Sequence, residues 1–296
     1  MASMTDKVPH GDGGDAGLTP DTLRQMYREM QLTRMLDERM LQLNRMGKAP
    51  FSISGQGHEA AQIGAAFAFD RSRDWFLPYY RDWAVCLHVG MSPRDLLLNF
   101  LAKAEDPNSG GRQMPGHFGS RRLRIVTASS PVTTQFLHAV GIAYAAKIRR
   151  EETVVYASLG EGSTSQGDYH EALNFAAIHE LPVVFFVQNN NYAISVPLDQ
   201  QMAVHNVADR AAANGLPGLI VNGTDVFETY AGVREAVARA RRGGGPSLVE
   251  AKCARFQPHS GDDDDKYRDP AEVAALRRDD PLPRFREQLI ARGVLD

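Results

Sequence analysis

The chain has 296 residues, of which 43% are hydrophobic and 23% are charged, so it is long enough to bury one large core. Its formal net charge of −3 excludes an overall basic surface of the kind that binds nucleic acid or an anionic membrane. The two cysteines, Cys86 and Cys253, stand far apart and outside any C-x-x-C pattern, which argues against a disulfide framework and a zinc site and favours a reducing compartment.

The N-terminal segment 1–18 is rich in glycine and aspartate and predicts a disordered tail. It lacks the apolar core of a secretory signal, and no stretch of the chain reaches the ~20 apolar residues of a membrane helix. We therefore expect a cytoplasmic protein without a membrane contact, and a single folded domain over residues 19–296.

An amphipathic helix is expected to open this domain. Thr19 is a suitable N-cap and Pro20 a suitable first helical residue. Apolar side chains then recur at helical spacing until Gly47, namely at Leu23, Met26, Tyr27, Met30, Leu36, Met40 and Leu43. We interpret this stripe as core or interface packing rather than as a cofactor site.

Strands alternate with helices from residue 153 onward. Buried strands are predicted at 153–159, 182–188, 219–221 and 247–253, and helices at 168–179 and from Val226 to the break at 243–246. This order predicts an α/β fold, with a mostly parallel sheet and helices on both faces. Ligands of such sheets bind beyond the carboxyl ends of the strands, which is where Gly160 and Asn189 stand.

The stretch LGEGSTSQGD places Glu161 between two glycines at the end of a predicted strand. A dinucleotide-binding G-x-G-x-x-G motif would require a third glycine where Ser165 stands. A P-loop would require a lysine where Asp168 stands. Neither NAD nor a nucleoside triphosphate is therefore favoured as the ligand.

A diphosphate held through Mg²⁺ fits these strand ends better. If the first two of these strands are neighbours, Glu161 converges with the amides of the asparagine run 189–191, and the glycines beside it expose backbone N–H groups. Carboxylate, amide and carbonyl oxygens suit Mg²⁺, and the helix beginning near Gly167 would direct its dipole to the same anion. Spacing alone leaves open the alternative that the glycines only form a turn and the asparagines only a loop.

These residues resemble a known cofactor motif. GEG, followed after 27 residues by Asn190 in NNNYAIS, is similar to the thiamine-diphosphate motif, usually G-D-G and then N-N. The wider segment GEGSTSQGDYHEALNFAAIHELPVVFFVQNNNYAIS resembles alpha subunits of the branched-chain 2-oxo acid (2-oxoisovalerate) dehydrogenase decarboxylating component, and the resemblance covers essentially residues 19–296. Glu161 replaces the commoner aspartate, which favours the branched-chain members. The resemblance implies the thiamine-diphosphate-binding fold.

The resemblance also implies a set of ligands. Mg²⁺ would be held by Glu161, Asn190 and the backbone oxygen of Tyr192. Other residues implied to bind thiamine diphosphate are Tyr80, Arg81, Ser130, Val132, Gly160, Gly162, Ser163, Ile194 and His259. A monovalent-cation (K⁺) site of some relatives is matched by Ser129, Thr134 and Gln135. An arginine suits a phosphate, although an exposed loop salt bridge is the alternative for Arg81 taken alone.

Two histidines match the substrate side of the family's site. His259, in FQPHSGDDDDKYRD, matches a loop histidine that reaches the diphosphate and the reaction centre, and His117, in RQMPGHFGS, matches a second pocket histidine. A lone loop histidine is more often solvated, but within these motifs both are expected to be catalytic, either donating a proton or orienting the lipoyl group, because histidine titrates near neutral pH. Phe51 is expected to form a wall of the substrate pocket with His117. The acidic run 262–265 is typical of a solvated face, whereas the family has an acidic loop here that becomes ordered around the cofactor.

The implied activity is oxidative decarboxylation of branched-chain 2-oxo acids, with transfer of the acyl group to the lipoyl group of an acyltransferase. The resemblance also implies a beta subunit in an α2β2 heterotetramer, which supplies the glutamate that activates the cofactor. Two alternatives stay open: a pyruvate or acetoin dehydrogenase alpha subunit, whose members more often carry a G-x-x-M-H segment where this chain has MPGHFGS, and a non-catalytic diphosphate-binding regulatory subunit.

Overall fold

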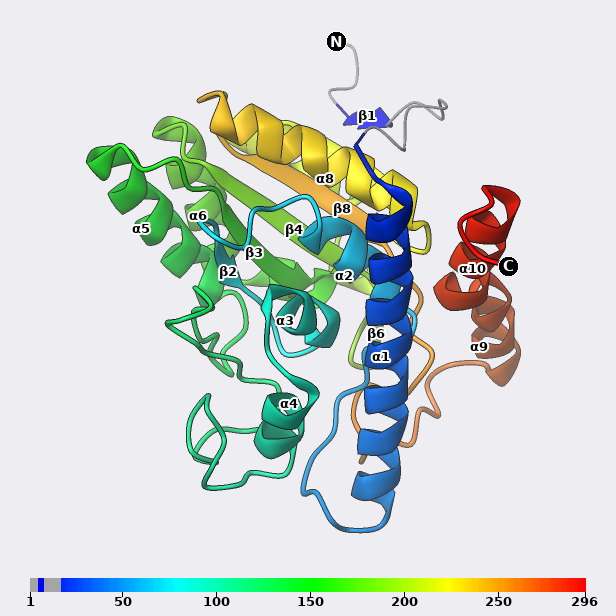
Figure 1. The fold of residues 1–296 in the computed structure, drawn as a ribbon. Coiled ribbons are helices and arrows are strands. Elements are labelled where there is room, and N and C mark those ends of the chain that lie inside the picture. Colours follow the sequence, from blue (N-terminus) through cyan, green and yellow to red (C-terminus); the bar gives the residue numbers. More distant parts are fainter. Residues whose placement is uncertain (1–4, 8–16) are drawn as a thin grey trace.

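A parallel sheet forms the centre of the molecule (Figure 1). The computed structural model describes residues 5–7 and 17–296. Within them the main sheet has six strands in the order β1-β7-β8-β4-β3-β2, and every neighbouring pair is parallel. The strands are β1 Thr5–Lys7, β2 Trp75–Leu77, β3 Val155–Gly160, β4 Val183–Asn189, β7 Gly218–Asn222 and β8 Ser247–Lys252. The predicted α/β fold is confirmed.

Both faces of the sheet are buried. Successive strand residues point to opposite faces, so Tyr156 and Phe186 enter one hydrophobic core while Ala157 and Phe185 enter another. All four side chains are fully buried. A parallel sheet covered on both sides requires such nearly continuous apolar strands.

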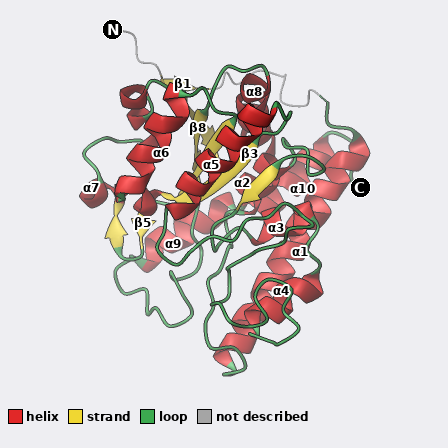
Figure 2. Cartoon of the chain, turned by 90° about the vertical axis from the view of Figure 1, so that its left-hand side faces the viewer, coloured by secondary structure: helices red, strands yellow, loops and turns green. Residues whose placement is uncertain are grey.

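Helices supply the two covering layers (Figures 1 and 2). On one face α8 packs on the sheet and α2 packs on α8, with α1 and α3 beside α2, and on the other face α5 and α6 pack together. The helices are α1 Pro20–Arg45, α2 Glu59–Ala66, α3 Trp83–Val89, α4 Pro93–Phe100, α5 Thr134–Arg149, α6 Gly167–Ile178, α7 Leu198–Gln201, α8 Val226–Arg241, α9 Pro270–Leu276 and α10 Pro281–Ala291. Short 3-10 helices lie at Glu161–Ser165, Val207–Arg210, Ala212–Asn214 and Arg277–Asp279, and a small hairpin is formed by β5 Tyr192–Ala193 and β6 Val196–Pro197.

The predicted first helix is confirmed as α1. The hydroxyl of Thr19 accepts the backbone N–H of Thr22 at 3.2 Å, and Pro20 is the first helical residue. The apolar stripe predicted from spacing supplies most of its buried side chains, namely Leu23, Met26, Met30, Leu36 and Met40. These side chains join two of the hydrophobic cores, which confirms packing as their role.

The alternating second half is also confirmed, since β3, α6, β4, β7, α8 and β8 occupy the predicted segments. In the first half, β2 and α2 to α5 were not predicted. Every residue of α2 is buried, so the helix has no polar face whose period would reveal it.

Five residues of the expected disordered tail belong to the described residues: Thr5–Lys7 pairs with Gly218–Ile220 at the edge of the sheet, and Gly17 and Leu18 precede α1. Residues 1–4 and 8–16 of that predicted tail lie outside the described residues, and both the disordered tail and a single domain over 19–296 stay predictions. Within the described part of the chain, no helix has the length and apolar character needed to cross a membrane.

Candidate active site

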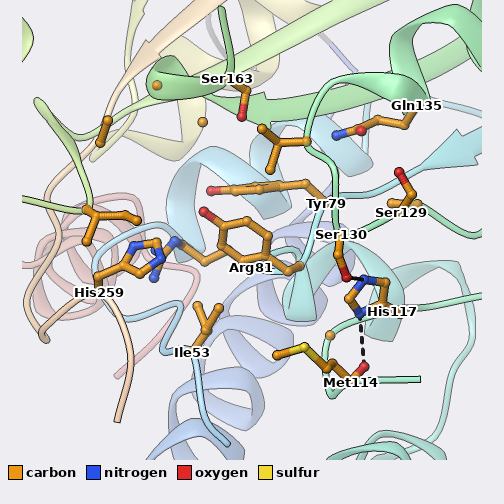
Figure 3. A pocket seen from close by; sticks show the side chains of 18 of the residues that line it. Ile53, Tyr79, Arg81, Met114, His117, Ser129, Ser130, Gln135, Ser163 and His259 are labelled. Atoms are coloured by element: carbon orange, nitrogen blue, oxygen red, sulfur yellow. Dashed lines mark hydrogen bonds between the residues drawn. The ribbon is translucent and has the colours of Figure 1, made fainter. Parts of the chain in front are cut away.

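A cavity of about 390 Å³ lies beyond the carboxyl ends of β3 and β4, which are neighbours as predicted (Figure 3). It gathers side chains from loops that are far apart in sequence. The predicted residues among its lining are Phe51, Tyr80, Arg81, His117, Ser129, Ser130, Val132, Gln135, Gly160, Glu161, Gly162, Ser163, Asn190, Tyr192, Ile194 and His259. Thr134 does not line it. The fold thus brings almost the whole predicted set together, while the roles of these residues stay predictions.

Glu161 presents a carboxylate oxygen without a partner. The residue is 1% exposed, its Oε2 accepts the backbone N–H of Asn190 at 3.2 Å, and its Oε1 has no hydrogen-bond partner among the described residues. Burial raises the pKa of Glu161 to about 7. A cation beside this carboxylate would favour its charged form and satisfy the free oxygen.

Only Asn190 of the asparagine run lines this cavity. Its Oδ1 accepts the backbone N–H of Tyr192 at 3.3 Å. Asn189 instead donates from its Nδ2 to the buried carboxylate of Glu250 at 2.6 Å, and Asn191 has a left-handed φ of 69° and does not line the cavity. The prediction that all three amides converge is wrong for Asn189 and Asn191, because successive residues at the strand end point in different directions.

The two glycines beside Glu161 have different reasons to be glycine. A Cβ on Gly162 would lie 2.5 Å from the Cβ of Ala193 in β5, so the chain itself requires glycine there. A Cβ on Gly160 would meet only a ring carbon of Tyr79 at 3.8 Å, which is ordinary van der Waals contact. The room above Gly160 is therefore not used by the protein's own packing.

The helix whose dipole was expected at this site, α6, does not follow β3 directly. The 3-10 helix Glu161–Ser165 separates β3 from α6, and Gly167 is exposed and absent from the cavity lining. The start of the helix at Gly167 is confirmed, and its effect on a bound anion stays a prediction.

Arg81 lies on the cavity wall with its guanidinium buried. It is 1% exposed, its Nη1 donates to the backbone oxygen of Ser54, and its Nε has no partner among the described residues. The guanidinium carbon lies 5.5 Å from the ring centre of Tyr80. The alternative of an exposed loop salt bridge is therefore excluded, and a buried positive charge with spare N–H capacity faces the cavity.

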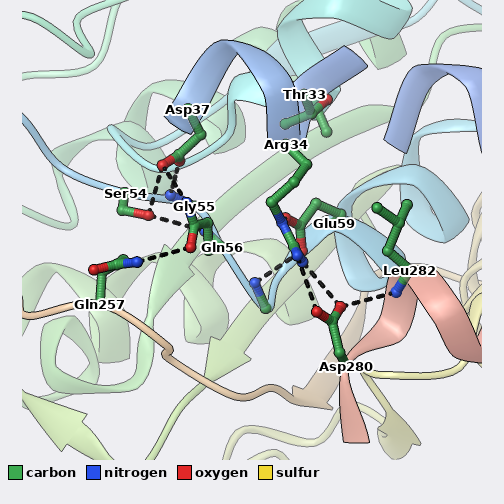
Figure 4. Close-up of polar contacts among 12 residues, drawn as sticks. Thr33, Arg34, Asp37, Ser54, Gly55, Gln56, Glu59, Gln257, Asp280 and Leu282 are labelled. Carbon is green, nitrogen blue, oxygen red and sulfur yellow. Dashed lines mark hydrogen bonds and ion pairs between the residues drawn. The ribbon is translucent and has the colours of Figure 1, made fainter. Parts of the chain in front are cut away.

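The loop beneath Arg81 is held by Asp37 of α1 (Figure 4). The Asp37 carboxylate accepts the Ser54 hydroxyl at 2.8 Å, the Gly55 N–H at 2.6 Å and the Gln56 amide at 3.3 Å. Burial raises the pKa of Asp37 to about 6. This network fixes the loop that presents Ile53 to the cavity.

Both ring nitrogens of His117 have a hydrogen-bond partner. Its Nδ1 lies 3.0 Å from the backbone oxygen of Met114, and its Nε2 lies 2.9 Å from the hydroxyl of Ser130 (Figure 3). Because a carbonyl oxygen only accepts, Nδ1 carries a proton, and Nε2 shares a hydrogen bond with the Ser130 hydroxyl.

His259 is held at the opposite side of the cavity. Its backbone N–H donates to Asp263 of the acidic run at 2.9 Å, and its ring meets that of Tyr80 edge-on at 6.1 Å. Burial, and then the positive charges of Arg81 and Arg255, lower the pKa of His259 to about 4. The pKa of His259 thus lies below the near-neutral value on which its expected role as a proton donor was based.

The residues matched to the monovalent-cation site lie close together. The hydroxyls of Ser129 and Thr134 contact each other, and both donate to the backbone oxygen of Pro131. Gln135 donates to Ser158 at 2.9 Å, and its buried Oε1 has no partner among the described residues.

Sequence reasoning missed several residues here. Tyr79, Ile53 and Met114 line the cavity, and only their closeness to Tyr80 or His117 in sequence gave a signal. His58 is fully buried, and its Nε2 lies 3.3 Å from Nδ2 of Asn190, a contact across 132 positions that no sequence pattern announced.

Within the described residues, no group of three or more histidine, cysteine, aspartate or glutamate side chains can hold a metal ion. A cation in this cavity would instead combine the Glu161 carboxylate with neutral oxygens, which is the ligand chemistry of Mg²⁺ rather than of zinc.

Comparison with known proteins agrees with this geometry. The family described as the dehydrogenase E1 component matches residues 27–296. The 2-oxoisovalerate dehydrogenase subunit alpha of Bacillus subtilis is 55% identical over 280 residues, which cover 94% of this chain and 85% of that protein. The 3-methyl-2-oxobutanoate dehydrogenase subunit alpha of Mycobacterium tuberculosis is 42% identical, over 94% of this chain and 73% of that protein. The pyruvate dehydrogenase E1 component subunit alpha of Staphylococcus aureus is 37% identical, over 94% and 72%.

Proposed function

Because the chain belongs to the dehydrogenase E1 component family, we propose that it is the alpha subunit of a thiamine-diphosphate-dependent dehydrogenase of branched-chain 2-oxo acids such as 2-oxoisovalerate. The observation that carries the proposal is the free Oε1 of Glu161, a buried carboxylate oxygen in a cavity lined by the predicted cofactor residues. The higher identity to the 2-oxoisovalerate relative than to the pyruvate relative supports the branched-chain substrate.

The residues present fit a metal-bound diphosphate. Mg²⁺ would be held by Glu161, by Oδ1 of Asn190 and by the backbone oxygen of Tyr192, with phosphate oxygens and water completing its preferred six ligands. The diphosphate would lie against the backbone of Gly160–Ser163, where the chain leaves room, and near the buried charge of Arg81. Ser129, Thr134 and Gln135 are proposed to hold K⁺.

When bound, thiamine diphosphate supplies the carbon nucleophile and the electron sink that decarboxylation of a 2-oxo acid requires. This chain's own residues would bind the cofactor, orient the substrate and exclude water. Phe51, Ile53 and Met114 form an apolar wall that suits a branched acyl group, although such a wall separates acids differing by one methylene by only ~1 to 3 kcal/mol. His117, whose orientation Ser130 fixes, and His259, whose pKa is lowered, are proposed to make hydrogen bonds to substrate and cofactor.

A second chain is part of the proposal. Among the described residues that line the cavity, Glu161 has the only carboxylate and is proposed to bind the metal, so the glutamate that activates the cofactor would come from a beta subunit in an α2β2 heterotetramer. The acyl group would pass to a lipoyl-bearing acyltransferase. We place the complex in the cytoplasm, since Cys86 and Cys253 are both free and buried.

Calorimetry of the heterotetramer tests the metal site. In Glu161→Gln, which keeps shape but loses the charge, Mg²⁺-dependent binding of thiamine diphosphate is expected to weaken by at least about tenfold. Glu171→Gln, on the exposed face of α6, is the matched control and is expected to bind as the wild type does. Equal affinity of the two variants would refute the ligand assignment.

Substrate preference is tested by decarboxylation assays on 2-oxoisovalerate, pyruvate and 2-oxobutyrate with the co-expressed beta subunit. The branched acid is expected to give the highest kcat/KM. Equal or higher turnover of pyruvate would overturn the branched-chain assignment, and an intact complex that binds the cofactor but turns over none of the three would favour a regulatory subunit.

A further inference from the structure

The side-chain amide of Asn190 has a partner on each side. Its Oδ1 accepts the backbone N–H of Tyr192 at 3.3 Å, and its Nδ2 lies 3.3 Å from Nε2 of His58. An amide nitrogen only donates, so Nε2 of His58 is the acceptor and the ring proton resides on Nδ1. The two contacts together fix which end of the amide faces which way.

We propose that His58 is a positioning residue that holds the Asn190 amide with its nitrogen away from the metal, so that a lone pair of Oδ1 stays available as a ligand. This inference rests on the proposed function, because it gives His58 a task only if Asn190 binds Mg²⁺. Partners of this kind, which orient the residues that touch a metal, typically change metal affinity ~10- to 100-fold when they are removed.

A packing role alone does not account for His58. The side chain is fully buried at the start of α2, and its Nδ1 has no hydrogen-bond partner among the described residues. A buried polar atom without a partner costs free energy that an apolar side chain of similar size would not cost. The polar ring is therefore explained by the function of its other nitrogen, Nε2, which contacts the amide of Asn190.

The position of Asn190 makes the orientation matter. Without an acceptor at residue 58, only the N–H of Tyr192 still orients the amide, so the amide turns over more easily and presents its NH₂ group to the cation site, where it repels Mg²⁺. Glu161 lies directly beside it and is held by the backbone of the same asparagine at 3.2 Å, so the two ligands form one unit.

The test is a calorimetric Mg²⁺ titration of the α2β2 heterotetramer at saturating thiamine diphosphate. Thermal unfolding of the same proteins is measured in the absence of Mg²⁺ and cofactor. His58→Leu removes the acceptor and is expected to weaken Mg²⁺ binding by ~10- to 100-fold while leaving the unfolding temperature unchanged or higher. His58→Gln restores an acceptor oxygen and is expected to bind Mg²⁺ within a few-fold of the wild type.

His88→Leu is the matched control, since His88 is also a buried histidine but bonds to Glu29 at 3.0 Å outside the cavity. It is expected to lose stability and keep the Mg²⁺ affinity. Wild-type affinity in His58→Leu, or equal loss in His58→Leu and His58→Gln, would overturn the inference. Glu161→Gln in the same titration distinguishes failure of the proposed metal site from failure of the role of His58. If Glu161→Gln binds Mg²⁺ as the wild type does, the proposed metal site is refuted. If Glu161→Gln binds Mg²⁺ more weakly but His58→Leu does not, only the role of His58 is refuted.

Discussion

The two glycines around Glu161 allow one substitution to be tested in two environments. In Gly162→Ala the new methyl would lie 2.5 Å from the Cβ and 3.2 Å from the Cα of Ala193, and a contact this short with the strand β5 cannot be relieved by rotating a side chain. The hairpin has to move, which we expect to cost about 1 to 3 kcal/mol of unfolding free energy, as overpacking does elsewhere. The same hairpin carries Tyr192 into the cavity, so cofactor affinity should fall as well.

Gly160→Ala is the matched substitution. Gly160 has an extended backbone, φ −85° and ψ 158°, and its Cβ would make only a 3.8 Å contact. The unfolding free energy is expected to stay within about 0.5 kcal/mol of the wild type, or to rise slightly because alanine restricts the unfolded chain. The methyl projects into the space we assign to the diphosphate, so affinity for thiamine diphosphate should fall although the fold is intact.

Denaturant unfolding of the purified variants, paired with cofactor titration of the heterotetramers, distinguishes the two outcomes. If Gly160→Ala loses as much stability as Gly162→Ala, or binds the cofactor as the wild type does, our reading of the empty space above Gly160 is refuted.

Two further predictions concern buried charges. Burial raises the folded-state pKa of Asp37 from 3.8 to about 6, so the stability that protonated Asp37 contributes is fully present below about pH 4 and is lost as the pH rises to about 6. Relative to Asp37→Asn, the wild type should therefore lose about 3 kcal/mol of unfolding free energy between pH 4 and pH 7. Parallel denaturation series that show a pH-independent difference between the two proteins would contradict this. Asp280 accepts two hydrogen bonds from Arg34, at 2.9 and 3.0 Å, and so joins α10 to α1 (Figure 4). Asp280→Asn can keep the helix cap but loses the charge, and it should lower the unfolding free energy by about 1.5 to 3 kcal/mol in denaturation at pH 7. A loss near zero would show that Glu59 alone holds the arginine.

Local patterns were sufficient for the elements that carry their own signal. The helix α1 and the strands β3 and β4 could each be predicted from their own segment. Burial of one face imposes a helical period on α1, and burial of both faces imposes a continuous apolar run on the strands. The all-buried α2 shows the limit of that approach, since a helix without a polar face has no period to find.

The candidate site divides in the same way. The sequence by itself determined that Glu161 and Asn190 follow two strands of a parallel sheet, and the rule that ligands bind beyond the carboxyl ends of such strands then placed them together. The tertiary structure decided which asparagine faces the cavity, which glycine has free space above it, and that burial and two arginines move His259 away from neutral titration. Only the tertiary structure brings His58 to Asn190. These residues are 132 positions apart, and their contact depends on how α2 packs in the fold, which no local sequence pattern reveals.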